Sequence, residues 1–447
     1  MPSGDPSVNR RAKRLLDIHT TLDQLSSSPC SHDVMEVALA TATSLPLCST
    51  EHPIPVWLLI VGDPSSGKTD GVNALKDSPR VFFLDTMTDN SLASGYVDKK
   101  GNRAPCLYDK IKGKTVVIKD WTTMLSRREE SVRAILGELQ SAYDGKYSKA
   151  TGSVGVIECE GTFSFIACVT PLAIKRHHNY MSLLGGRFLM IRLVPLTEQE
   201  REEGFERCWD EASRDEHRST LKRLVVQHLE DLHHSPPDLQ PEADTQKQDL
   251  NRLARFIARG RGAVITERVT DLDEATGQER CRYEVVDIQV EEPFRVLQQL
   301  RTLGRALARL HGRGRMTDHE IELLRRVALS TVPPERAQIL GLYGKGHGEL
   351  SVSDCASALG CSRTRARQVL TTLAALGVLA ERKHGPQSTY SPAPDMAPIV
   401  CRPVTGLDHT LDLSTQVTQN STHIYTTTPP SPVRSLVSGQ TGEEPLP

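Results

Sequence analysis

The chain has 447 residues, which is enough for two or three domains and at least one large hydrophobic core. Its formal net charge of −2 excludes a globally basic field, so any contact with nucleic acid must come from a local patch. The ten cysteines include no C-x-x-C pair, which argues against a zinc site and for reduced thiols. We find neither an apolar run of membrane-spanning length nor an apolar signal segment, so we expect a soluble cytoplasmic chain that binds no membrane.

The first predicted elements are a polar segment and one helix. Residues 1–33 are polar and weakly patterned. Asp33 is a suitable N-cap, and the apolar residues after it recur on one helical face up to Pro46. We expect this helix to pack beside the domain that residues 34–197 form.

The next stretch combines a buried strand with a glycine-rich loop. Residues 56–61 are apolar, and residues 62–69 fit the phosphate-binding pattern G-x-x-x-x-G-K-[ST]. Glycines at both ends of such a loop let backbone N–H groups turn toward phosphate oxygens. Lys68 can then reach the β- and γ-phosphates, and the Thr69 hydroxyl can bind Mg²⁺. The predicted site for ATP and Mg²⁺ consists of Gly62, Asp63, Pro64, Ser65, Ser66, Gly67, Lys68, Thr69 and Asp70.

Strands and helices alternate through the rest of this domain. Apolar runs predict further strands at 81–86, 114–120, 155–160, 162–170 and 187–194. Residues 126–145 carry apolar side chains at a spacing of three to four, which is typical of an amphipathic helix. The alternation predicts an α/β fold in which helices cover a parallel sheet. Asp120, at the end of one strand, is a second candidate to hold Mg²⁺.

The middle of the chain, residues 198–332, is predicted to be mainly helical. Residues 198–259 have helical periodicity, and further helices are expected from Pro293 and over about 317–330. Between them, residues 261–290 predict an inserted β-hairpin with Gly277 in its turn.

Residues 333–392 have the element order of a winged helix-turn-helix. Three short helices are predicted at 335–344, 351–360 and 362–377, followed by two strands within 378–392. Ser362 is a good N-cap for the third helix. The predicted DNA contacts are Arg363, Arg365, Arg367, Gln368, Arg382 and Lys383. The alternative to DNA binding is a solvated arginine-rich helix in a protein-binding domain.

Residues 393–447 are predicted to be a disordered tail rich in Pro, Thr and Ser.

The order of these motifs resembles a known family. The motifs follow one another as in the core of the AAA+ ATPases. Their order is phosphate loop, acidic strand, amphipathic helix, hairpin, FIACVTP and SLLGGRFLMIRL. Within that superfamily the chain is most similar to minichromosome-maintenance helicases and to ATPases of bacteriophages and mobile elements. The resemblance covers roughly residues 34–330 and implies that residues 198–332 form a helical lid. It also implies a homo-oligomeric ring.

The resemblance implies roles for three further residues. Thr170 stands where the family places a polar residue that positions the attacking water, although the family commonly has Asn there. Arg187 matches an arginine that reaches into the site of a neighbouring subunit, where its charge would stabilise the transferring phosphoryl group. Arg295 opens the helix equivalent to one in the lid and is expected to contact the γ-phosphate.

The acidic strand departs from the family pattern. The family usually has two adjacent acids, one for Mg²⁺ and one for water, whereas this chain has Lys119 followed by Asp120. Counted forward from the strand, Asp120 takes the place of the acid that holds Mg²⁺. Counted back from the end of the motif, it takes the place of the acid that activates water. The sequence does not decide between the two roles. Hydrolysis is then either slow or helped by a distant acid such as Glu138.

The leading hypothesis is an ATP-hydrolysing motor that acts on DNA, a helicase-like replication protein of a phage or mobile element. A DNA-binding regulator whose oligomeric state depends on ATP is one alternative. A nucleotide-dependent scaffold with little hydrolysis is another.

Overall fold

The computed structural model describes residues 6–49, 51–89, 91–93, 106–151, 155–176, 186–272, 279–385 and 387–403. In this part of the chain no helix is long and apolar enough to cross a bilayer. Residue 277 and residues 404–447, which include the predicted hairpin turn and most of the predicted tail, lie outside the described residues.

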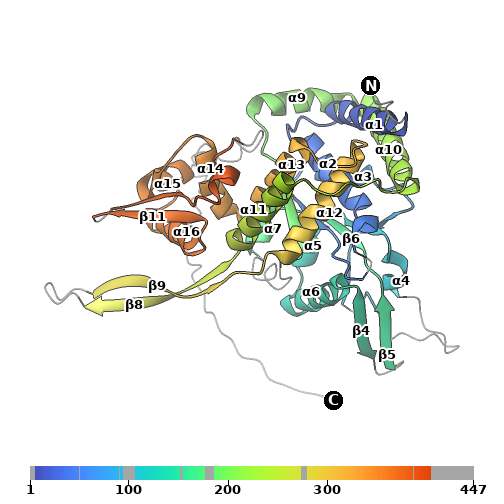
Figure 1. Cartoon of the computed structure of the whole chain (residues 1–447). Coiled ribbons are helices and arrows are strands. Elements are labelled where there is room, and N and C mark those ends of the chain that lie inside the picture. Colours follow the sequence, from blue (N-terminus) through green and yellow to red (C-terminus); the bar gives the residue numbers. More distant parts are fainter. Residues whose placement is uncertain are drawn as a thin grey trace, which may run out of the picture.

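The centre of the molecule is a five-stranded parallel sheet with helices on both faces (Figure 1), which confirms the α/β prediction. Its order is β2-β3-β6-β1-β7. The strands are β1 (Trp57–Val61), β2 (Val81–Leu84), β3 (Thr115–Ile118), β6 (Ser164–Val169) and β7 (Phe188–Arg192). Every residue of β1 is buried, because strands β6 and β7 flank it and helices cover it. Such nearly continuous apolar runs are typical of parallel strands buried on both faces.

Side chains of β1 alternate between two hydrophobic cores. Leu58 and Ile60 belong to the core that includes α2 (Ser31–Thr43) and α12 (Phe294–Leu310). Trp57 and Leu59 point into the other core, which α4 (Leu107–Ile111) and α6 (Glu129–Tyr143) complete. The short helices α5 (Thr122–Leu125) and α7 (Pro171–Arg176) and the antiparallel pair β4 (Lys146–Thr151) and β5 (Gly155–Glu160) complete this domain.

The edge strand β7 is covered rather than left open. Helix α13 (Asp318–Thr331) lies against it, and its last turn supplies hydroxyl groups to the strand's backbone. Met190 N–H donates to Thr331 Oγ1 at 3.0 Å, and Arg192 N–H donates to Ser330 Oγ at 3.2 Å. Because free edge N–H groups invite pairing with other chains, this helix protects the sheet.

The N-terminal segment differs from its polar appearance in the sequence. Residues Pro6–Asp23 form helix α1, whose buried face consists of Leu15, Ile18 and Leu22. This face packs against α10 (Glu211–His234). The spacing of these three residues at i, i+3 and i+7 indicates a helical face, but the charged residues around them make the pattern weak in the sequence.

The predicted helical region begins with three helices and the predicted hairpin. Helices α9 (Glu198–Trp209), α10 and α11 (Asp244–Gly260) are followed by strands β8 (Ala263–Leu272) and β9 (Glu279–Gln289), which pair antiparallel. The hairpin extends away from the body of the molecule in Figure 1. Helices α12 and α13 then return to the sheet.

The C-terminal unit, residues 333–403, contains four helices and a three-stranded sheet in its described part. The helices are α14 (Pro334–Gly344), α15 (Val352–Leu359), α16 (Arg363–Ala375) and α17 (Ala397–Val400), and the strands are β10 (Leu350–Ser351), β11 (Leu379–His384) and β12 (Gln387–Pro392). Residues 393–403 are therefore not a disordered extension, because Met396, Ile399 and Val400 are buried. Arg325 of α13 holds this end by donating to the carbonyl oxygens of Ile399, at 2.7 Å, and Arg402, at 3.1 Å.

Candidate nucleotide-binding site

The predicted phosphate loop leaves the sheet at its carboxyl edge, beside the central strand. Gly62 N–H donates to the carbonyl oxygen of Val169, the last residue of β6, at 3.2 Å. Leu193 N–H, just after β7, donates to the carbonyl oxygen of Val61 at 2.7 Å. Ligands of open α/β sheets bind outside the carboxyl ends of such strands.

The loop backbone has the conformation that its glycines allow. Gly67 has φ of 83°, and Ser65, at 61°, is the single non-glycine residue with positive φ among the residues that the structure describes. A Cβ atom on Gly62 would lie 2.8 Å from Ser66 Oγ and 3.0 Å from Leu193 Cβ, so glycine leaves room for the close approach of these side chains. An unfavourable backbone conformation at a non-glycine residue is typical of functional loops.

The loop leaves hydrogen-bond donors open. Within the described chain, the N–H groups of Gly67, Lys68 and Thr69 donate to no protein acceptor. Helix α3 (Lys68–Asn73), which follows, has only six residues, and the Asp70 carboxylate in its first turn is 3.5 Å from Arg218 of α10. Successive open N–H groups around a curved backbone form a cradle for an anion such as a phosphate group.

The Lys68 ammonium lies inside this cradle. It donates to the carbonyl oxygen of Gly62 at 2.7 Å and to that of Asp63, and it is 3.3 Å from Ser66 Oγ. Burial lowers the pKa of Lys68, and the nearby negative charges of Asp63 and Asp120 partly oppose that effect. The lysine is thus surrounded by weak neutral acceptors, which a phosphate group can replace with a stronger charge-assisted bond.

Asp120 lies at the same edge of the sheet, two residues beyond the end of β3. Its carboxylate accepts a hydrogen bond of 2.9 Å from Thr122 N–H and is exposed to solvent. The neighbouring Lys119 is 3.4 Å from Asp85, which follows β2. Asp85 is an acid that the sequence analysis did not select, although its position directly after a buried strand was a signal. The residue before Asp120 is thus a lysine held in an ion pair with Asp85.

Thr170 follows β6 at this edge and is partly buried. Its N–H donates to Thr122 Oγ1 at 3.3 Å, which links it to the turn that contains Asp120. Its hydroxyl accepts a long hydrogen bond of 3.4 Å from Ala173 N–H, as an N-cap of α7 does. The structure thus brings together the loop, Asp120 and Thr170, whereas Glu138 is held by an ion pair with Lys149 on β4.

The two other predicted arginines lie at the opposite edge. Arg187 immediately precedes Phe188, which pairs with Trp57 at the start of β1. Its guanidinium is 5.3 Å from the centre of the Tyr143 ring and 3.4 Å from Asp144, and only 6% of the residue is exposed. Burial lowers the pKa of Arg187, and the charge of nearby Arg295 lowers it further.

Arg295, in the first turn of α12, therefore belongs to the same neighbourhood as Arg187. Gln299, one turn further along α12, donates to Tyr143 Oη at 2.9 Å and to the carbonyl oxygen of Arg187 at 2.6 Å. Five strand residues separate the two edges, a distance of roughly 16 Å. In this arrangement neither arginine approaches the phosphate loop of its own chain.

The predicted DNA-contacting side chains all lie on the surface of the C-terminal unit. Arg363, Arg365, Arg367 and Gln368 are exposed at the start of α16, and Arg382 and Lys383 are exposed on β11. Ser362 caps α16 as predicted, accepting a hydrogen bond of 3.2 Å from Arg365 N–H. Arg365 pairs with Glu335, and Arg382 is 3.0 Å from Glu349. Helix α16 and strand β11 contact each other, so the two groups share one end of the molecule (Figure 1).

Compared with known proteins, the chain matches no protein-family model and no curated protein. The resemblance to AAA+ ATPases therefore stays a prediction that rests on the motifs and on their order.

Proposed function

We propose that this protein is an ATP-binding and ATP-hydrolysing motor of the AAA+ type that acts on DNA. One observation carries the proposal: a strained glycine loop with open N–H groups surrounds Lys68 at the sheet edge that also holds Asp120 and Thr170. Cation, donors and acid at one edge are the groups that phosphoryl transfer needs, because its catalysis consists of positioning and charge stabilisation.

The residues present fit the two cofactors. The open N–H groups of the loop and the Lys68 ammonium would hold the phosphates, and Thr69 and Asp120 offer oxygen ligands for Mg²⁺. Mg²⁺ supplies neutralisation of the phosphate charge when it is bound. Thr69 and Asp120 are both exposed, so solvent reaches the place where the ion would bind.

The proposed DNA contact is the arginine surface of the C-terminal unit, whose helices and hairpin are ordered as in a winged helix. The ion pairs of Arg365 and Arg382 are exposed, and exposed pairs contribute little free energy. A DNA phosphate can therefore displace Glu335 or Glu349 at small cost. The exposed position of Arg363 and Arg367 beside them supports the same surface.

The test is ATP turnover by the full chain, with and without single-stranded DNA. We expect single strands to stimulate turnover and the Lys68→Ala variant to show none. Replacing Arg363, Arg365 and Arg367 together by alanine should weaken DNA binding and reduce the slope of log K against log salt by roughly 0.9 for each phosphate that is no longer neutralised. An unchanged affinity and slope in the folded triple variant would mean that DNA is not bound there.

A scaffold with little hydrolysis is the second candidate, and the ion pair between Lys119 and Asp85 favours it. Lys119, which forms this pair, stands where the resembled family has one of the two acids that hold the metal and polarise water. Tight ATP binding without turnover, with or without DNA, would support the scaffold.

Sequence-selective binding of duplex DNA without stimulated turnover would instead support a regulator.

A further inference from the structure

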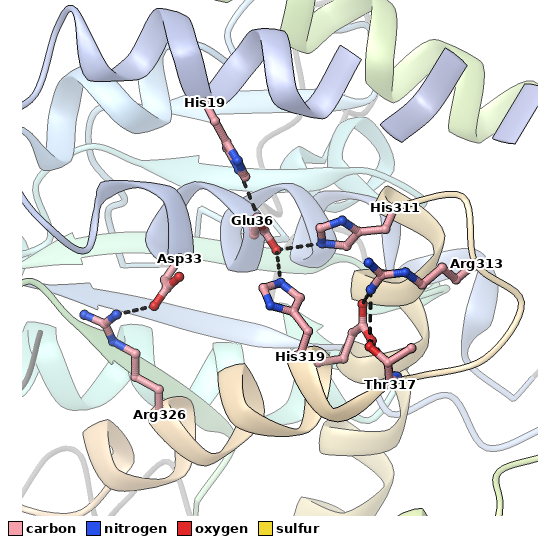
Figure 2. Close-up of polar contacts among 9 residues, drawn as sticks. His19, Asp33, Glu36, His311, Arg313, Thr317, His319 and Arg326 are labelled. Carbon is pink, nitrogen blue, oxygen red and sulfur yellow. Dashed lines mark hydrogen bonds and ion pairs between the residues drawn. The ribbon is translucent and has the colours of Figure 1, made fainter. Parts of the chain in front are cut away.

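Three imidazoles converge on one buried carboxylate outside the candidate nucleotide site (Figure 2). The carboxylate is that of Glu36 on α2, which is 2% exposed. His311 Nε2 lies 3.0 Å and His319 Nε2 lies 3.3 Å from its Oε2 atom. His19 Nε2 of α1 lies 3.2 Å from the other oxygen, Oε1. The cluster thus joins residues that are up to 300 positions apart in the sequence.

The charge of Glu36 is balanced in an unusual way. Burial disfavours a charged carboxylate, and the imidazoles of His19, His311 and His319 are the groups that lie against its oxygens. These three groups are imidazoles rather than permanently charged side chains. A buried ion normally needs a charged partner or a metal.

The spacing of the ligand atoms fits a metal ion. The Glu36, His311 and His319 atoms all lie within 4.8 Å of one another. Zinc binds imidazole nitrogen and carboxylate oxygen at about 2.0–2.1 Å, and two ligands at a tetrahedral angle are then roughly 3.3 Å apart. The measured separations from Glu36 Oε2, 3.0 Å and 3.3 Å, are close to this value.

The turn that carries two of the histidines is fixed independently of the cluster. His311 ends α12, and Gly312 follows with φ of 73°. Thr317 caps α13, with its N–H donating to Glu320 Oε2 at 2.6 Å, and Arg313 pairs with the same buried Glu320 (Figure 2). These contacts hold the two imidazoles in place before any ligand arrives, which is the condition for a preorganised site.

We propose that Glu36, His311 and His319 bind a zinc ion, with His19 as a positioning residue on the second carboxylate oxygen. Metal at this place replaces the two Nε2···O contacts. Each imidazole then binds through a deprotonated Nε2 and carries one proton on Nδ1, and any second proton goes to solvent. The His319 side chain is 48% exposed, which gives the ion an entry path and leaves a ligand position for water. Two histidines, one carboxylate and a water are a donor set that zinc accepts.

The ion would connect the helical region to the nucleotide domain. Glu36 belongs to α2, which packs against the sheet and against α3, the helix after the phosphate loop. His311 and His319 flank the turn between α12 and α13. The inference concerns the stability of this junction and does not depend on ATP binding.

The experiment is a titration of the full, metal-free chain with Zn²⁺, followed by calorimetry and by thermal melting. We expect one ion per chain with a dissociation constant below about 1 μM, which corresponds to about 8 kcal/mol, and a higher melting temperature in its presence. Cobalt(II) in place of zinc should give the visible absorption of a site with nitrogen and oxygen ligands, a signal that hydrogen bonds alone cannot produce.

Variants separate ligands from a supporting residue. His311→Asn and His319→Asn should each weaken zinc binding more than about 100-fold, whereas His19→Asn should weaken it about 10- to 100-fold, as loss of an outer hydrogen-bond partner does. His234→Asn, in an exposed histidine pair on α10, is the matched control and should bind as the wild type does.

Two results would overturn the proposal. One is a folded wild-type chain that takes up no zinc at micromolar concentration and gives no cobalt spectrum. The other is zinc binding that survives both His311→Asn and His319→Asn. In either case Glu36 and its histidines form a hydrogen-bonded junction only.

Discussion

The two edges of the parallel sheet hold their charged side chains in opposite ways. At the carboxyl edge, Lys68 contacts carbonyl oxygens of its own loop, and Asp120 is exposed with one backbone hydrogen bond. At the amino edge, Arg187 is buried against the Tyr143 ring, and Gln299 holds both Tyr143 and the Arg187 backbone. The first edge contributes open donors, whereas the second holds its arginine in buried contacts with the chain itself.

Under the proposed function, one sheet separates binding at one edge from stability at the other. A group that serves a ligand is surrounded by weak protein contacts, so that its removal changes binding more than folding. A buried cation that packs on an aromatic ring contributes to folding, because its removal leaves a cavity and exposes the ring. Substitutions at the two edges should therefore have opposite profiles.

The largest effect is expected for Lys68→Ala at the carboxyl edge. Under the proposed function, removal of the Lys68 ammonium should weaken ATP binding by about 100-fold or more. The melting temperature should stay close to that of the wild type, because within the described residues the Lys68 ammonium makes hydrogen bonds to its own loop alone. Calorimetric titration with ATP checks the affinity, and near-normal binding by the folded variant would contradict the assignment of the loop.

Asp120→Asn should have the next largest effect, on turnover rather than on binding. If Asp120 orients water or holds the metal, the rate should fall about 100-fold while ATP affinity changes much less. Asp85→Asn is the matched control, because Asp85 is an exposed acid at the same edge that pairs with Lys119. Equal reduction in both variants would show that the two acids act together and that the single-acid interpretation is wrong.

The sheet could be predicted from the sequence because its information is local. Apolar runs such as residues 56–61 and 164–169 mark buried strands, and the loop pattern marks the candidate site. Helix α1 was missed because, within residues 10–23, its buried apolar face consists of only Leu15, Ile18 and Leu22. The ordered segment 393–403 was missed because hydrogen bonds from Arg325 to its backbone, rather than its composition, hold it in place.

The Glu36 cluster could not be predicted for a different reason. Its histidines come from α1, α12 and α13 and approach one another only when these helices pack. The cysteine pattern argued against zinc, but a site made of histidine and glutamate leaves no spacing signal in the sequence. Arg187 is a mixed case. Its place beside a strand could be predicted from the sequence, but its burial depends on Tyr143 and α12.

Arg187→Ala tests whether the amino edge contributes to stability. We expect it to reduce stability by about 2–3 kcal/mol, because the variant lacks the buried guanidinium that packs on the Tyr143 ring. Arg133→Ala, an exposed arginine paired with Glu129 on α6, should change stability by less than about 0.5 kcal/mol. Thermal melting of both variants without nucleotide measures the difference.

The same variant tests the proposed ring. Arg187 lies at the edge away from its own phosphate loop, so a catalytic role requires a neighbouring subunit and release from the Tyr143 ring. Mixing folded Arg187→Ala subunits with Asp120→Asn subunits should restore part of the ATP turnover, because some interfaces then combine two intact halves. No recovery in confirmed mixed oligomers would assign Arg187 to folding alone.

Tyr143→Phe should have the smallest effect and isolates one hydrogen bond at the amino edge. The Tyr143 hydroxyl accepts from Gln299 Nε2 at 2.9 Å, while the same nitrogen also donates to the Arg187 carbonyl oxygen. Phenylalanine keeps the ring under the guanidinium and beside Trp57, so only the shared hydrogen bond is removed. The expected decrease in stability is about 1 kcal/mol, with ATP affinity unchanged. A reduced ATP affinity at unchanged stability would contradict the proposed difference between the two edges. It would mean that the amino edge contributes to binding rather than to stability.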